Sequence, residues 1–169
     1  ITKALAAFER TLISGNSKYD KAMNAVAGVF LTESEVEGYN LFFGDKLQCK
    51  NCHSGFNFTD QDFQNNGLLE NYDTDEGRAR ITGLSEDIGK FKIPTLRNVE
   101  LTAPYMHDGS IGTLNEVIDF YMSGGSNHPN KNNLIQAFTL TETEKQSLID
   151  FLKTLTDETF INNPEWRNN

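Results

Sequence analysis

Apolar side chains recur at helical spacing in four stretches of the chain. The first, ITKALAAFERTLISG, places Ala4, Phe8 and Leu12 four residues apart, which predicts an amphipathic helix from the outset. The other three stretches each follow a capping box, in which a Thr hydroxyl and a Glu carboxylate satisfy free amides at a helix start. The boxes are TESE at 32–35, TLNE at 113–116 and TETE at 141–144.

Each capping box predicts a helix with an apolar face. Glycine directly follows the first two of these helices, which is a common way for a helix to end. The expected helical residues are Val36, Tyr39, Leu41, Phe42 and Phe43 before Gly44, then Leu114 to Met122 before Gly124, then Leu148, Ile149, Leu152 and Leu155.

Residues 54–112 show no sustained period, and Asp, Asn and Gly dominate them. The runs NNG, DTDEG and IGKFKIP punctuate this segment. Long loops of this kind are usually functional or disordered, and the Phe, Ile, Leu and Tyr spread through this one argue against disorder. The pattern predicts an all-α protein with one long irregular segment.

Composition narrows the class of protein. The 169 residues suit one domain, and no apolar stretch is long enough to cross a bilayer. A net charge of −9 and a pI of about 4.8 disfavour nucleic acid and anionic lipid as partners, and suit a basic protein partner. The sequence begins with neither an initiator Met nor a signal peptide, so we expect the chain to start inside something larger.

The motif CKNCH at 49–53 contains both cysteines of the chain. Two cysteines three positions apart on a helical turn point the same way, so both thiols can add to the vinyl groups of one heme. The imidazole of the next residue then lies under the iron. Cys49, Cys52 and His53 therefore predict c-type heme attachment.

Three other readings of this motif fit less well. A thioredoxin-like dithiol would need a βαβ context that the pattern lacks, and it leaves His53 unexplained. A disulfide between the two cysteines leaves the same histidine unexplained. A structural zinc site would need four ligands, and only His107, His128 and scattered carboxylates remain to supply them.

The stretch GYNLFFGDKLQCKNCH resembles the N-terminal helix and attachment site of class I cytochromes c. In that fold this helix crosses the C-terminal helix at a small residue. Gly38 would let the helix of residues 148–155 approach closely, with Phe151 or Leu152 over it.

A narrower resemblance covers nearly the whole chain. Residues 75–125, from DEGRARITG to DFYMSGG, look like the signature region of the bacterial diheme cytochrome c peroxidases and their relatives. These relatives include the diheme enzyme that matures methylamine dehydrogenase. Residues 7–22 are similar to the segment that joins the two heme domains of that family. The resemblance implies linker helices over 1–30 after a missing N-terminal heme domain, and a C-terminal cytochrome c-like heme domain over 31–169 whose irregular loops wrap the heme.

In that family the upstream heme cleaves hydrogen peroxide, and the C-terminal heme relays electrons from a small donor protein, a cytochrome c or a cupredoxin. A calcium ion lies between the domains, and its ligands in this chain would be the backbone carbonyls of Thr102 and Pro104 in LTAPY. Carbonyl oxygens suit this hard cation. The family and the heme motif imply a periplasmic location, and family members are often homodimers.

The sixth iron ligand has two candidates. A Met thioether opposite His raises the potential of an electron-transfer heme. Met23 is better explained as core and Met106 as packing, which leaves Met122. In the resemblance, however, the peroxidase ligand Met falls on Tyr121, and the methylamine dehydrogenase maturation enzyme uses a Tyr at that place.

Neighbours on a helix point about 100° apart, so only one of these two side chains can face the iron. We favour Tyr121 over Met122 or an open iron. A phenolate ligand would stabilise ferric and higher oxidation states and lower the potential, whereas Met122 would do the reverse.

Five other features of the sequence could each have a functional or a structural role. Arg97 could hold a heme propionate or brace a carboxylate, and we lean towards the propionate. His107 could join Asp108 near the heme edge. His128 is expected to be structural, Trp166 to pack, and the acidic run at 73–76 to be a solvated loop.

Three functional hypotheses follow. The first is the electron-relaying half of a peroxidase that reduces hydrogen peroxide to water. The second is the same scaffold oxidising a protein or organic substrate through high-valent iron, as Tyr121 would indicate. The third is a monoheme electron carrier, and a second CxxCH upstream of Ile1 would exclude it.

Overall fold

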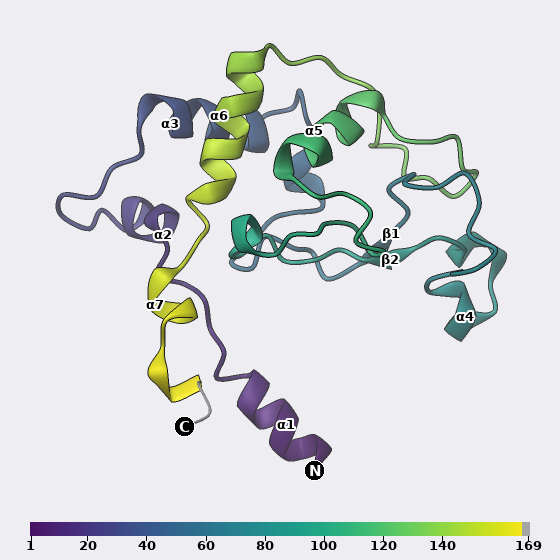
Figure 1. Ribbon diagram of the computed structural model, residues 1–169, viewed down its shortest axis with the longest axis horizontal. Coiled ribbons are helices and arrows are strands. Elements are labelled where there is room, and N and C mark those ends of the chain that lie inside the picture. Colours follow the sequence, from purple (N-terminus) through teal and green to yellow (C-terminus); the bar gives the residue numbers. More distant parts are fainter. Residues whose placement is uncertain (167–169) are drawn as a thin grey trace.

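The structure is a computed structural model that describes residues 1–166 of the chain. It is mostly helical, with one small sheet (Figure 1). The α-helices of the described residues are α1 (Thr2–Glu9), α2 (Lys18–Met23), α3 (Glu33–Phe43), α4 (Ala79–Thr82), α5 (Leu114–Ser123), α6 (Glu142–Lys153) and α7 (Glu158–Ile161). Short 3-10 turns are η1 (Cys49–Asn51), η2 (Ser85–Asp87), η3 (Val99–Leu101) and η4 (Pro164–Trp166).

The all-α prediction needs one correction. Strands β1 (Phe63–Gln64) and β2 (Phe91–Lys92) pair antiparallel, with Phe63 opposite Lys92 and Gln64 opposite Phe91. Two residues are too few to show the alternating pattern by which a strand is recognised in a sequence.

The three predicted capped helices are confirmed as α3, α5 and α6. In each, the Thr hydroxyl accepts from the backbone amide of the Glu, and the Glu side chain accepts from the Thr amide. A fourth capping box, between Ser17 and Asp20, begins α2 and was not predicted. Its Ser-x-x-Asp spelling departs from the usual Ser/Thr-x-x-Glu/Gln pattern.

The core lies where α3 crosses α6, at the top of Figure 1, and α5 closes it from a third side. Its centre is a cluster of aromatic rings in which Phe42, Phe58 and Phe151 are at most 2% exposed. The predicted close approach at Gly38 is confirmed. The residues above it are Ser147 and Phe151, so Phe151 is the correct one of the two expected neighbours.

The first 30 residues divide into two unlike parts. Helix α1 stops at Glu9, short of Leu12, and has no buried residue; it extends from the lower end of the molecule in Figure 1. In contrast, Ser17 and Asp20 are buried, and the Tyr19 amide donates to the Thr154 carbonyl at 3.0 Å. Contacts with residues beyond position 31 are thus already made within the expected linker segment. At the other end, residues 167–169 of the expected 31–169 domain lie outside the described residues.

The irregular segment after the CKNCH motif is packed, as its apolar residues predicted. Phe58, Tyr72 and Ile93 are buried in it. Isolated bridges join Gly77 to Lys90 and Tyr105 to Ile111. No helix among residues 1–166 is both long and apolar enough to cross a membrane.

Candidate functional site

The CKNCH motif forms a helical turn. The amides of Cys52 and His53 both donate to the Cys49 carbonyl, at 3.2 and 2.9 Å. Gln48, with φ of 63°, adopts a left-handed conformation that begins the turn. The turn directs all three side chains of the predicted attachment site into one cavity, which Cys49, Cys52 and His53 line together.

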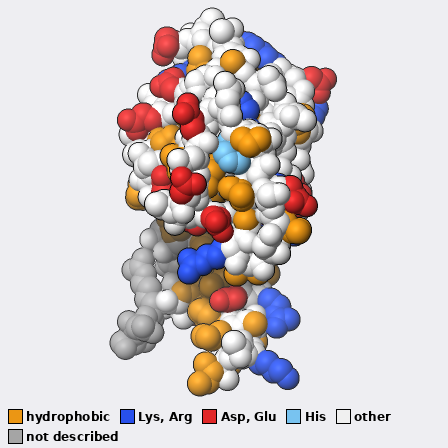
Figure 2. Space-filling view, turned by 90° about the vertical axis from the view of Figure 1, so that its right-hand side faces the viewer, with side chains coloured by type: hydrophobic (Ala, Val, Ile, Leu, Met, Phe, Trp, Pro, Cys, Tyr) orange, Lys and Arg blue, Asp and Glu red, His pale blue; other side chains and the backbone are white. Residues whose placement is uncertain are grey.

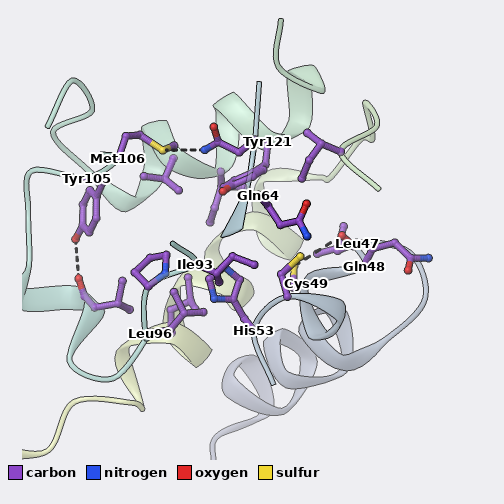
Figure 3. Close-up of a pocket in the computed structure, with 18 of the residues that line it drawn as sticks. Leu47, Gln48, Cys49, His53, Gln64, Ile93, Leu96, Tyr105, Met106 and Tyr121 are labelled. Carbon is purple, nitrogen blue, oxygen red and sulfur yellow. Dashed lines mark hydrogen bonds between the residues drawn. The ribbon is translucent and has the colours of Figure 1, made fainter. Parts of the chain in front are cut away.

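This cavity has a volume of about 420 Å³ and mostly apolar walls. Helices α3, α5 and α6 and the irregular segment all contribute to it (Figure 3). Representative wall residues are Phe42, Ile93, Val99, Leu114, Ile118 and Leu152. Volume and lining match the general properties of sites for a flat apolar cofactor such as heme.

His53 is held in one orientation by the loop that follows it. Its Nδ1 lies 3.0 Å from the Phe58 carbonyl oxygen. Since a carbonyl can only accept, Nδ1 carries the proton and Nε2 keeps a free lone pair for a metal. Burial lowers the pKa of His53, although the Phe58 carbonyl, Asp60 and the Pro94 carbonyl oppose the shift. The net direction favours the neutral imidazole that a metal ligand requires.

The two thiols lie in apolar surroundings. Burial raises the pKa of Cys49 to about 12 and also raises the pKa of Cys52. A redox-active dithiol needs a lowered thiol pKa, so this environment disfavours the thioredoxin-like reading. Among residues 1–166 both cysteines are free, and no three His, Cys, Asp or Glu side chains converge as a metal site.

Helix α5 directs Tyr121 and Met122 to different places. Tyr121 lines the cavity and lies across it from His53 and Cys49 (Figure 3). Burial raises the pKa of the Tyr121 phenol, and an interaction with Asn66 opposes the shift. Met122 instead packs against the hydrophobic core and is not among the residues that line the cavity.

The other two methionines lie in different surroundings. Met23 was expected in the core but is 49% exposed, because α2 turns it towards solvent. Met106 packs in the cavity wall, and its sulfur accepts from Asn66 Nδ2 at 3.5 Å. Gln64 and Asn66 also line the cavity. Neither residue was predicted to line a site, because a two-residue strand and the loop after it have no recognisable sequence period.

Arg97 does not line the cavity. Its guanidinium donates to Asp20 and to the Phe56 carbonyl, so the residue braces a buried carboxylate. No contact described for residues 1–166 directs it to the propionate that we favoured. Thr102 and Pro104 both line the cavity. Within residues 1–166 no hydrogen bond is donated to the carbonyl oxygen of either one.

The contacts and exposure of the remaining residues with two possible roles indicate which role each one has. His107 lines the cavity and stacks on Phe91, with ring centroids 3.6 Å apart. His128 is structural as predicted, because its Nδ1 meets the Asn65 side chain and the Asn130 amide at 3.2 and 3.1 Å. Trp166 packs on Phe160, also as predicted. Asp73, Asp75 and Glu76 are exposed.

Comparison with known proteins gives one consistent picture. The chain is 35% identical over 158 residues to the methylamine utilization protein MauG of Methylorubrum extorquens, and 38% identical over 161 residues to the cytochrome c551 peroxidase of Nitrosomonas europaea. Each alignment covers 94% of this chain and 44% of the relative. No family model matches the chain.

Solved structures agree with the sequence relatives. A MauG-like protein associated with microbial copper homeostasis superposes with a TM-score of 0.91 at 40% identity, covering 97% of this chain and 55% of that one. The diheme peroxidase BthA of Burkholderia thailandensis shares the fold, with a TM-score of 0.65 at 20% identity over 86% of this chain and 47% of that one. The chain thus spans about half the length of the relatives that it matches.

Proposed function

Because the chain belongs to the bacterial diheme cytochrome c peroxidase family, we propose that it is the C-terminal, cytochrome c-like heme domain of a diheme oxidoreductase, in which Tyr121 would bind the heme iron. The family implies covalently bound c-type heme as the cofactor. Cys49 and Cys52 would attach it, and His53 Nε2 would bind its iron.

One observation carries the ligand assignment. Tyr121 lies across the cavity from His53, whereas its helical neighbour Met122 is packed against the core. When bound, the heme supplies reversible electron transfer at its iron. A phenolate oxygen from Tyr121 would favour the ferric and more oxidised states and lower the potential. The remaining cavity-lining side chains are mostly apolar and would limit the access of water to the iron.

This arrangement supports a domain that stores oxidising equivalents. The whole enzyme would use hydrogen peroxide at an upstream heme and oxidise a protein or organic substrate. Relatives named MauG and a MauG-like structure agree with this proposal.

The second candidate function is electron relay in a peroxidase that reduces hydrogen peroxide to water. A relative named cytochrome c551 peroxidase favours it. The donor would be a small basic cytochrome c or cupredoxin. On the face in Figure 2, acidic side chains surround a small apolar patch with a histidine, which suits such a donor.

Two further proposals concern the setting of the domain. The carbonyls of Thr102 and Pro104, to which no described residue donates, would bind calcium together with ligands from the upstream domain. A periplasmic location would agree with thioether attachment of heme and with the family resemblance. A homodimer remains an expectation from the resemblance.

Absorption spectra of the purified ferric protein test the ligand assignment, with Tyr121→Phe and Met122→Leu as a matched pair on one helix. We expect phenolate-to-iron charge transfer in the wild type and in Met122→Leu, and its loss in Tyr121→Phe. A sulfur-to-iron band in the near infrared that only Met122→Leu abolishes would instead establish Met122 as the ligand and favour electron relay.

A further inference from the structure

Arg97 is a buried cation that lies behind the His53 loop instead of in the cavity. Its side chain is 4% exposed. Nε and Nη2 both donate to the Phe56 carbonyl oxygen, at 2.9 and 2.6 Å. The guanidinium also lies 4.7 Å from the ring centre of Phe56 and 5.2 Å from that of Phe58.

The loop that Arg97 contacts is the one that orients His53. The Phe58 carbonyl accepts from His53 Nδ1, and Phe58 itself has φ of 50°. This left-handed conformation is uncommon for a bulky residue, so surrounding contacts must maintain it. Arg97 supplies two such contacts. It donates hydrogen bonds to the carbonyl of Phe56, two residues before Phe58, and its guanidinium lies over the ring of Phe58.

Asp20 fixes Arg97 from the other side. Its Oδ2 accepts from Arg97 Nη1 at 2.6 Å and from the amide and hydroxyl of Ser17 at 2.9 and 2.7 Å. Burial opposes ionisation of Asp20, but the hydrogen bonds from Arg97 and Ser17 outweigh it and lower the pKa of the carboxyl. The carboxylate is therefore charged, and its Oδ2 accepts three hydrogen bonds.

We propose that Arg97 and Asp20 are positioning residues for the iron ligand, because they hold the Phe58 carbonyl against His53 Nδ1. A strong hydrogen bond at Nδ1 makes the imidazole a more basic ligand and stabilises the ferric state. This inference rests on the proposed heme-binding function and deepens it. It also connects α2 to the iron ligand through Arg97 and the loop after His53, and α2 lies within the segment expected to join the two heme domains.

The test is the midpoint potential of the heme of this domain, measured by spectroelectrochemistry on the full-length holoprotein. Arg97→Met removes every donor but keeps an unbranched side chain, and we expect a higher potential. Arg97→Lys keeps the charge but cannot bond Phe56 and Asp20 in the same fork geometry, so a smaller shift in the same direction is expected. Asp20→Asn should also raise the potential.

Asp87→Asn is the matched control. Asp87 is another buried carboxylate paired with an arginine, Arg78, but it lies in the segment before β2 and does not touch the His53 loop. Its substitution should lower stability without moving the potential. If Arg97→Met does not fold, Arg97→Lys and Asp20→Asn decide the question by the same measurement.

The outcomes separate this inference from the proposed function. A wild-type protein without heme on Cys49 and Cys52, checked by mass spectrometry, would overturn both. A wild-type protein with heme, combined with unchanged potentials in the Arg97 and Asp20 variants, would overturn the positioning role alone. An equal shift in Asp87→Asn would also overturn it, because the effect would then follow from lost stability.

Discussion

Gly38 of α3 lies directly against the backbone of Ser147 in α6. A β-carbon added at Gly38 would be 1.9 Å from the Ser147 carbonyl oxygen and 2.7 Å from Cβ of Phe151. Neither obstacle is the flexible end of a side chain, so the two helices would have to separate. The glycine therefore sets the distance between the helices that form two walls of the cavity.

Gly38→Ala should destabilise the protein by about 3 kcal/mol, at the upper end of the range for overpacking. The intrinsic helix preference of Ala, about 1 kcal/mol over Gly, is too small to reverse the sign. Urea unfolding measures the change. Gly112→Ala is the control, since its β-carbon would meet nothing closer than a Glu116 oxygen at 3.5 Å; equal losses in both variants would contradict the close-contact argument.

Thr113→Ala should cost about 1 kcal/mol of stability, the usual effect of losing a helix cap. The Thr113 hydroxyl accepts from the Glu116 amide at 3.2 Å and begins α5, which carries Tyr121. Thermal unfolding provides the measurement. Thr156→Ala removes an exposed hydroxyl that contacts Glu100 at 3.3 Å, and it should change stability by less than about 0.5 kcal/mol.

Asp157→Asn should lower stability at pH 7 by about 2 kcal/mol, because hydrogen bonds to a buried carboxylate are lost or weakened. Asp157 is 1% exposed, and its Oδ2 accepts from the Gly15 and Asn16 amides at 2.9 and 2.8 Å. Burial opposes its ionisation, but bonds from Thr159, Asn16, Phe160 and Gly15 lower its pKa below the usual 3.8.

The same carboxylate predicts a pH dependence. Because its pKa in the folded protein is lower than in the unfolded chain, its contribution is complete well above pH 3.8 and is lost as the pH falls through 3.8 and below. Wild type and Asp157→Asn should therefore differ most at neutral pH and converge towards pH 2. Asp73→Asn, at an exposed position, should follow the wild type throughout; a gap that stays constant with pH would count against this account.

Replacing both attachment cysteines, Cys49→Ala with Cys52→Ala, should abolish covalent heme and lower the Tm by at least about 10 °C. Without the thioether bonds, the heme either does not occupy the apolar cavity of about 420 Å³ or can dissociate from it. A ligand that binds only the folded state contributes directly to stability, so its loss lowers the Tm. Heme staining and thermal unfolding report the two effects. Asn51→Ser, at an exposed position between the cysteines, should keep both heme and Tm.

The sequence determined those features whose contacts lie within a few residues. Three capping boxes identified α3, α5 and α6, because the two partners of a box are three positions apart and need no other part of the chain. The CKNCH motif predicted a turn that directs Cys49, Cys52 and His53 to one side for the same reason. Gly38 also carried a signal, since a glycine inside an apolar helix indicates a close neighbour.

Contacts between distant residues could not be predicted, because they depend on how the whole chain folds. Arg97 and Asp20 are 77 positions apart, and nothing near either one shows that they pair, so a propionate was the expected partner of Arg97. The strands β1 and β2 are defined by each other and not by any local pattern. The exposure of Met23 depends on where α2 packs.

Tyr121 and Met122 show most clearly where prediction from sequence ends and dependence on tertiary packing begins. The sequence placed both on one helix and showed that only one could face the cavity, because neighbours on a helix point about 100° apart. Which one faces it depends on the rotation of α5 about its axis. That rotation is fixed by packing of buried α5 residues such as Ile118 in the same core as Leu148 and Leu152 of α6, and no residue close in sequence to Tyr121 determines it.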